Sequence, residues 1–170
     1  MVNSNELLCV VDEYDMPQKP QPRHLVKKNG FWFRAVHVWI VNEKNQLLCQ
    51  KRSLKKDMSP GKWEPAVTGH ISPDDTYFTG AVREVREETG LPVTVDDLKL
   101  VKIYKDHEFR EYRGIFYCKI NTDLSDIKRE EDEVEEVKLL SINTLKRYFN
   151  EKPDVWITHD YAKEIFSVLN

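Results

Sequence analysis

Three glutamates, Glu84, Glu87 and Glu88, occur at spacings of three and four residues within the run from Gly69 to Leu91. On a helix, residues at i, i+3 and i+4 share one face, so the three carboxylates would be neighbours and would repel one another. A hard divalent cation such as Mg²⁺ or Mn²⁺ prefers oxygen ligands and would turn that repulsion into attraction. The spacing therefore indicates either a metal site or a solvated acidic face.

The residues around the glutamates predict the helix that must position them. Thr76 can accept hydrogen bonds from the first helical amides as an N-cap, and Gly90 stands where a left-handed residue ends a helix. Pro92 then prevents the helix from continuing. An apolar face repeats on the side opposite the glutamates, and it predicts packing against a core. Its residues are Phe78, Ala81, Val82, Val85 and Thr89.

Taken whole, the run resembles the Nudix box, G-x5-E-x7-R-E-U-x-E-E-x-G-U with U aliphatic, which is the signature of the Nudix hydrolase superfamily. Every specified position matches except one, where Asp75 replaces the first glutamate. The resemblance implies a metal-dependent hydrolase that cleaves the diphosphate linkage of a nucleoside diphosphate joined to another group. It implies Mg²⁺ as the cofactor, with Mn²⁺ as the alternative, and a small, nucleotide-derived diphosphate as the substrate.

The resemblance also assigns roles by position. Glu84, Glu87 and Glu88 would be metal ligands, Gly69 would offer its backbone carbonyl, and Arg83 would brace the carboxylates. Asp75 is one methylene shorter than glutamate, so a weaker tie to the helix is expected. The candidate catalytic residues are Glu84, Glu87, Arg83 and Glu111.

The base that takes a proton from the attacking water would be Glu84 or a loop residue such as Glu111. Glu111 aligns loosely with an acidic position of one branch of the superfamily, and its alternative role is that of a solvated hairpin residue. Both assignments stay open from the sequence.

A narrower resemblance, to the isopentenyl-diphosphate isomerase-like branch of Nudix proteins, rests on residues flanking the box. They are Phe33-Arg34-Ala35-Val36-His37-Val38-Trp39, Gln50-Lys51-Arg52-Ser53, Pro60-Gly61-Lys62-Trp63 and Gly69-His70. The isomerase needs a cysteine before the glycine-histidine pair, and here Thr68, a far weaker acid, takes that place. Phe33 stands where the isomerase has a metal-binding histidine. Isomerase activity is therefore disfavoured.

Four basic or imidazole side chains, together with Arg23, are candidates for holding a substrate phosphate, because a diphosphate needs positive charge beside the metal. Surface cations usually have no such role, and His70 beside a glycine turn can equally be structural. His37, among apolar neighbours, is expected in the core. The four phosphate candidates are Arg34, Lys51, Arg52 and His70.

Composition limits the remaining possibilities. The 170 residues suit one domain that is large enough to bury a hydrophobic core. The 26 Lys+Arg and 29 Asp+Glu give a net charge of −3, so no excess of positive charge favours nucleic acid as a partner. No apolar run approaches the ~20 residues of a membrane span, and Met1 to Val10 shows no secretory signal. Cys9, Cys49 and Cys118 fit neither a disulfide framework nor a zinc site. Buried thiols and a cytoplasmic location are expected, while the oligomeric state stays open.

The order of elements predicts one α+β domain over 1–170, with an arm (1–30), a core (31–140) holding the box (69–91), and C-terminal helices (141–170). The family fold, an α/β/α sandwich with a mixed sheet, agrees with this order. The arm would hold a strand and a Pro-rich connection ending in a helical turn. Expected strands cover 6–13, 31–41, 46–52 (pairing as a hairpin with 31–41), 63–67, 98–109, 112–120 and 134–139, and expected helices cover 23–30, 76–90, 141–150 and 158–169.

Two further functions remain as alternatives. One is a non-catalytic Nudix module that binds a nucleotide as a regulator; the other is the isomerase. A nearly complete box argues against the first, because a module without catalysis has no need of the full set of carboxylates.

Overall fold

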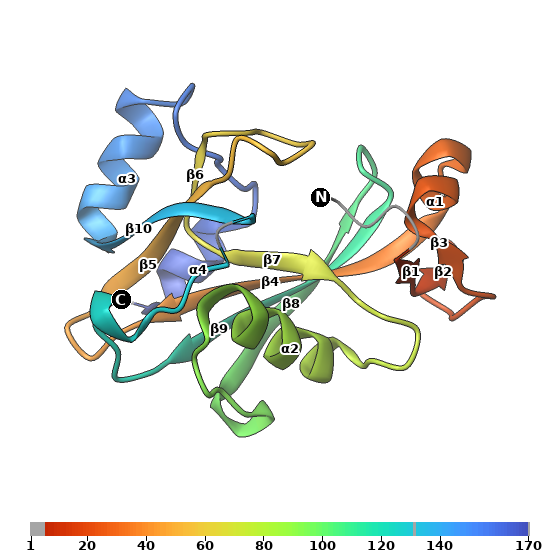
Figure 1. Ribbon diagram of the computed structural model, residues 1–170, viewed down its shortest axis with the longest axis horizontal. Coiled ribbons are helices and arrows are strands. Elements are labelled where there is room, and N and C mark those ends of the chain that lie inside the picture. The colour runs from red at the N-terminus through yellow and green to blue at the C-terminus, as the bar shows by residue number, and fades with distance from the viewer. Residues whose placement is uncertain (1–5, 131, 170) are drawn as a thin grey trace.

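The long strand β4 (Trp32–Val41) is the centre of the sheet in the computed structural model (Figure 1). It pairs in parallel with β9 (Glu111–Lys119) along its whole length, and antiparallel with β7 (Val67–His70) over its middle. Strand β8 (Leu98–Asp106) continues the sheet beyond β9, and β10 (Val134–Ser141) pairs with β5 (Gln46–Arg52) on the other side. The predicted α+β architecture with a mixed sheet is confirmed.

The structure describes residues 6–130 and 132–169. Positions 1–5 of the predicted arm, and positions 131 and 170, lie outside the described residues. Within the rest of the arm, β1 pairs with β3, β2 pairs with β4, and α1 ends at Gly30, whose φ of 64° is left-handed. The bounds are β1 Leu7–Leu8, β2 Val10–Val11, β3 Gln21–Pro22 and α1 Arg23–Asn29.

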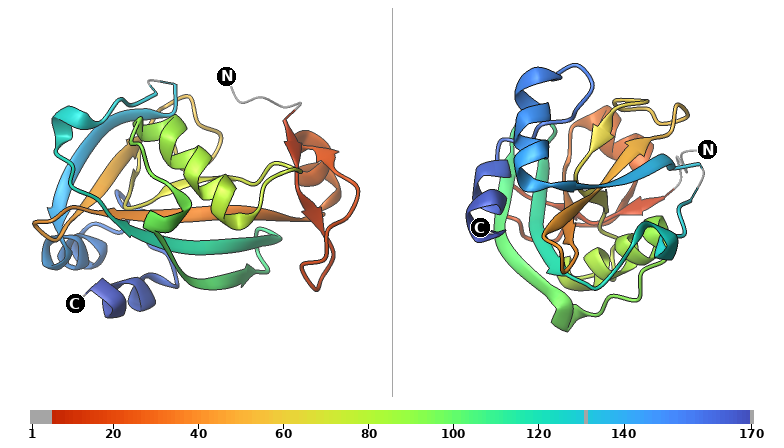
Figure 2. Two further views of the ribbon diagram at one scale, coloured as in Figure 1. Left: turned by 90° about the horizontal axis from the view of Figure 1, so that it is seen from below. Right: turned by 90° about the vertical axis from the view of Figure 1, so that its left-hand side faces the viewer.

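Helices cover both faces of β4, which explains why its side chains are apolar on both sides. Val36 and Val38 face α2 (Tyr77–Thr89), whereas Trp39 and Val41 face the C-terminal helices. Figure 2 shows α2 and the C-terminal α4 on opposite sides of the sheet. The two C-terminal helices are α3 (Ile142–Glu151) and α4 (Ala162–Leu169).

The caps predicted for α2 are confirmed. Thr76 accepts a hydrogen bond from the Thr79 amide, the Thr79 hydroxyl accepts one from the Thr76 amide, and Gly90 ends the helix at φ 71°. These contacts join residues three or four apart, so they follow from local sequence alone.

The predicted hairpin of β4 and β5 is confirmed at its turn only, and one predicted strand is divided in two. β5 meets β4 only at Val41 and Leu47 and then diverges, because β7 occupies the neighbouring position along β4. The single strand expected over 63–67 is two strands, β6 (Trp63–Glu64) pairing with β5, and β7 pairing with β4. The turn at Pro65-Ala66 lets one segment serve both partners.

In the part of the chain that the structure describes, no helix has the length and apolar character needed to cross a bilayer. Cys9, Cys49 and Cys118 are buried free thiols, as predicted. Short 3-10 turns, η1 (Val95–Asp97) and η2 (Leu124–Asp126), complete the connections.

Candidate active site

Gly69 and Glu84 are packed against each other at the centre of the candidate site. Gly69 lies on β7 opposite Val36 of β4, and Glu84 reaches over it from α2. A Cβ placed on Gly69 would lie 1.9 Å from Cδ of Glu84. The glycine is therefore required for space, because any side chain would displace the carboxylate.

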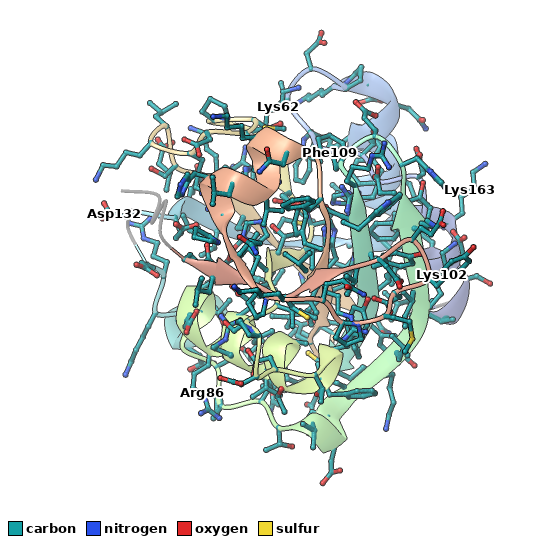
Figure 3. The ribbon with its side chains drawn as sticks, turned by 90° about the vertical axis from the view of Figure 1, so that its right-hand side faces the viewer. Lys62, Arg86, Lys102, Phe109, Asp132 and Lys163 are labelled. Atoms are coloured by element: carbon teal, nitrogen blue, oxygen red, sulfur yellow. The ribbon has the colours of Figure 1, made fainter. Side chains whose placement is uncertain are left out.

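Arg83 holds this arrangement together. Its Nη1 donates to Glu84 Oε1 at 2.7 Å and to Glu87 Oε2 at 3.2 Å, and its Nη2 donates to the His70 carbonyl at 2.8 Å. One guanidinium thus joins two carboxylates of α2 to the end of β7. Arg86, on the same helix, is exposed and points away from the molecule (Figure 3).

Asp75 makes the ionic tie to the helix despite its shorter side chain. Its Oδ2 accepts from Arg83 Nε at 2.9 Å, and its Oδ1 accepts from the Thr79 hydroxyl at 2.9 Å. The expected weakening of this tie is not seen in the geometry, because the loop brings the aspartate close enough to the guanidinium.

The acidic face of α2 is partly inside the protein, which corrects the expectation that all three glutamates lie opposite the core. Glu84 and Glu88 are 8% and 7% exposed, and only the Glu87 side chain, at 54%, is open to solvent. The Gln50 amide of β5 donates to Glu88 Oε2 at 2.6 Å. Strands β5 and β7 cover this side of the helix, which its own periodicity could not reveal.

Burial changes the acidity of both covered carboxylates. It raises the pKa of Glu84 to about 7, with the charge of Arg83 opposing the shift and that of Glu87 adding to it. It raises the pKa of Glu88 to about 8, opposed by the Gln50 amide and reinforced by Glu84. A divalent cation would stabilise the ionised forms of these two carboxylates. Their burial side by side therefore suits a metal site.

Glu111 lies away from this group. It begins β9 at the level of Phe33 on β4, is buried, and is paired with Arg113 at 2.7 Å and Lys27 at 3.5 Å. No contact joins it to Arg83 or Glu84 among the interactions of the described residues. Its role as a base therefore remains a prediction.

The four phosphate candidates already have anionic partners within the protein. Arg34 binds Asp15 at 2.7 Å and Arg52 binds Glu64 at 2.8 Å. Lys51 lies 3.3 Å from Glu135 Oε1, and His70 lies 3.6 Å from Glu6 Oε2. Arg23, the weaker candidate, lies 3.6 Å from Asp57.

The three α2 carboxylates do not converge on one point as they stand. Among the described residues, the set of three His, Cys, Asp or Glu side chains with ligand atoms all within 4.8 Å of one another is His37, Glu64 and His159. His37 is in the core, as its apolar neighbours predicted, but nothing in the sequence associates it with the other two. Gln50 was also missed as a partner of Glu88, since nothing local links positions 38 residues apart.

The residues of the α2 site fit a divalent cation by their chemistry. Glu84, Glu87 and Glu88 offer oxygen ligands, and the backbone of Gly69 lies against Glu84. Oxygen ligands with open positions for water and phosphate are what Mg²⁺ selects, and Mn²⁺ accepts the same set.

Comparison with known proteins agrees with this geometry. Nudix hydrolase 3 of Arabidopsis thaliana is 30% identical over 155 residues, covering 85% of this chain and 20% of that protein, so the chain spans a fifth of this relative's length. Isopentenyl-diphosphate Delta-isomerase 2 of Photorhabdus laumondii is 27% identical over 170 residues, covering 98% of this chain and 93% of that protein.

The crystal structure of DR0079 from Deinococcus radiodurans superposes with a TM-score of 0.74 at 19% identity, over 95% of this chain and 98% of that one. This likeness shows a shared fold. Residues 32–160 match the NUDIX domain family. This range includes the whole box and the strands β5 and β7 that cover α2. The chain therefore belongs to the Nudix family.

Proposed function

We propose that this protein is a metal-dependent hydrolase of phosphoric anhydrides, whose substrate is a nucleoside diphosphate linked to a further group. The observation that carries the proposal is the contact of Glu84 with Gly69, braced by Arg83. A solvated acidic face would need neither a glycine without room for a Cβ nor an arginine shared by three acidic side chains, Asp75, Glu84 and Glu87.

Nudix hydrolases depend on a divalent metal ion. We assign Mg²⁺, or Mn²⁺ in its place, to Glu84, Glu87, Glu88 and the Gly69 carbonyl. When bound, the ion would offset the charge that develops on the leaving phosphate. Arg83 would keep Glu84 and Glu87 on the same side of α2 before substrate arrives.

Glu84 is the better supported base of the two candidates. A base must lie within reach of the water that it activates, and Glu84 lies among the candidate metal ligands, whereas Glu111 is paired with Arg113 away from them. General base catalysis of this kind contributes roughly 10²–10⁴-fold to the rate. Glu111 remains the alternative base, and for this role a substrate-induced release from Arg113 would be needed.

The linked group is not specified by the box, because loops outside it select the substrate. A panel of nucleotide sugars, dinucleoside polyphosphates, nucleoside di- and triphosphates and isoprenoid diphosphates, each with Mg²⁺ and with Mn²⁺, tests the proposal by release of phosphate or nucleoside monophosphate. Metal-dependent release with at least one nucleotide, absent in Glu87→Gln, is the expected result.

The two alternatives give different outcomes in the same panel. Nucleotide binding by calorimetry without product release would support a regulatory module. Exchange of deuterium from heavy water into isopentenyl diphosphate would support the isomerase, which the overall likeness to the Photorhabdus enzyme favours. Against the isomerase, Thr68 lies 3.5 Å from Glu64 Oε2 where a cysteine acid would be required.

A further inference from the structure

A second group of ligating side chains lies on the other face of the sheet from α2. His37 comes from the middle of β4, Glu64 from β6, and His159 from the connection leading into α4. One ligand atom from each lies within 4.8 Å of the others. Because His37 alternates with the α2-facing residues Val36 and Val38, its side chain lies on the other face of β4 from α2. Glu64 lies nearer to the carboxylates of α2, since its charge adds to the raised pKa of Glu88.

One of these atoms, Nε2 of His159, faces a carboxylate oxygen of Glu64 but forms no well-aligned hydrogen bond with it. The His159 side chain is 7% exposed, and its Nε2 is buried with no hydrogen bond. That nitrogen lies 3.3 Å from Glu64 Oε1, but outside the geometry of a hydrogen bond. A buried nitrogen and a buried carboxylate oxygen that face each other without a well-aligned hydrogen bond leave bonding capacity unused, and a cation bound to both would use it.

The 3.3 Å separation is also compatible with two ligands of one metal ion. Tetrahedral ligands at about 2.0–2.1 Å from Zn²⁺ lie roughly 3.3–3.4 Å apart. Glu64 and His159 already have this spacing, and the remaining pairs lie within 4.8 Å, so a bound ion would draw them together by about 1.5 Å at most.

A contact with a residue outside the cluster orients each of the three side chains. His37 Nδ1 is hydrogen-bonded to the Tyr161 hydroxyl, which leaves Nε2 as the ligand atom when Nδ1 carries the proton. Arg52 Nη1 donates to Glu64 Oε2 at 2.8 Å, which leaves Oε1. The His159 ring stacks on Tyr161 with centroids 4.9 Å apart. Such outer contacts orient metal ligands in known sites.

We propose that His37, Glu64 and His159 bind a transition-metal dication of the Zn²⁺ class at a site distinct from the carboxylates of α2. Two imidazoles and one carboxylate, with a fourth position for water, are a donor set typical of zinc and unlike the all-oxygen sets of Mg²⁺. The ion would join two strands of the sheet to the segment that enters α4. Its binding would therefore stabilise the C-terminal part of the fold.

Cobalt substitution tests the proposal without substrate. The purified full chain is stripped with a chelator and titrated with Co²⁺ and, in competition, with Zn²⁺, following visible absorption and the melting temperature. A four- or five-coordinate nitrogen-containing site absorbs strongly, whereas Co²⁺ among carboxylates and water is octahedral and absorbs weakly. The expected result is a strong spectrum at one equivalent that Zn²⁺ abolishes and that Glu87→Gln leaves intact.

One variant removes a proposed ligand, a second removes a contact that orients another ligand, and a third is the control. His159→Asn should lose the strong spectrum and weaken binding by more than tenfold, and Tyr161→Phe should weaken it about 10- to 100-fold by freeing His37. His107→Asn, which removes an exposed histidine at a turn, is the matched control and should bind like the parent. Because His37 lies in the middle of the central strand and His159 lies in a connection, His159→Asn carries the test, with its melting temperature in chelator showing that it is folded.

Two results would overturn the proposal. One is a parent protein with weak absorption only and no rise in melting temperature with Zn²⁺, in which case His159 and Glu64 form a structural ion pair. The other is a strong spectrum that survives in His159→Asn, which would place the ion elsewhere.

Discussion

Gly69 and Glu84 approach so closely that a methyl group on the glycine would overlap the carboxylate carbon, at 1.9 Å. The contact joins a strand to a helix fifteen residues further along the chain. It is the tightest requirement for a particular residue in the site, and it makes the position of Glu84 depend on the absence of a side chain at 69.

Gly69→Ala should therefore displace Glu84 and lower kcat for nucleotide hydrolysis by about 10²-fold or more, because small misplacements of reacting groups carry costs of that size. Steady-state rates with Mn²⁺ measure the effect. Gly80→Ala is the matched control: its Cβ would meet Ile71 at 3.2 Å rather than a catalytic group, so activity should be retained. Equal losses in both variants would contradict the role of the Gly69 contact.

Arg83 and Arg86 offer a second matched pair on α2. Arg83→Gln breaks the links among Asp75, Glu84 and Glu87, and we expect metal affinity to fall about 10- to 100-fold, as for other residues that orient ligands. Arg86→Gln removes an exposed guanidinium and should change neither affinity nor rate. Isothermal titration with Mn²⁺ separates the two variants, and a parent-like affinity in Arg83→Gln would count against the bracing role.

Glu87→Gln and Glu88→Gln should both abolish metal-dependent turnover, but they should differ in stability. Glu87 is exposed, so its replacement leaves the metal-free melting temperature nearly unchanged. Glu88 is buried with a pKa raised to about 8, so replacing it by a neutral amide removes a buried charge above that pH. At pH 9, Glu88→Gln without metal should melt at or above the parent; a large decrease would show that its hydrogen bond with Gln50 matters more than its charge.

Metal should stabilise the protein more at high pH than at low pH. Burial raises the folded-state pKa values of Glu84 and Glu88, to about 7 and about 8, above the 4.5 of a free glutamate. Their contribution to stability is thus present below pH 4.5 and is lost as pH rises through 7 and 8. A cation that needs both ionised competes with protons at pH 6, so its apparent affinity should rise on the order of 10²-fold between pH 6 and 8.

Melting curves with and without Mn²⁺ at pH 6, 7, 8 and 9 check this dependence. The shift produced by the metal should grow across the series in the parent, and it should be smaller at each pH in Glu88→Gln. A shift that is the same at every pH would mean that Glu84 and Glu88 are ionised in the metal-free fold.

The local features of the site were predictable from sequence because they join residues a few positions apart. Thr76 and Gly90 bound the helix as expected, and Arg83 reaches Glu87 one turn away. The strand expected over 31–41 is likewise present as β4. Such features depend on helix and strand periodicity, which any single sequence carries.

The acidic face could be predicted but its burial could not. A helix's own pattern says which residues share a face, not which other elements cover that face. Gln50 and Gly69 reach Glu88 and Glu84 because β5 and β7 pass over α2, and the separation of β5 from β4 depends on β7 competing for the same edge.

By itself, then, the sequence determined a helix with three carboxylates, its ends and its bracing arginine, and with them the family. Tertiary structure alone decided that Glu84 lies on Gly69, and that His37, Glu64 and His159 meet across more than a hundred residues. The physical reason is range: hydrogen bonds and side-chain spacing within one turn are encoded locally, whereas contacts between distant segments follow from which faces the whole chain can bury together.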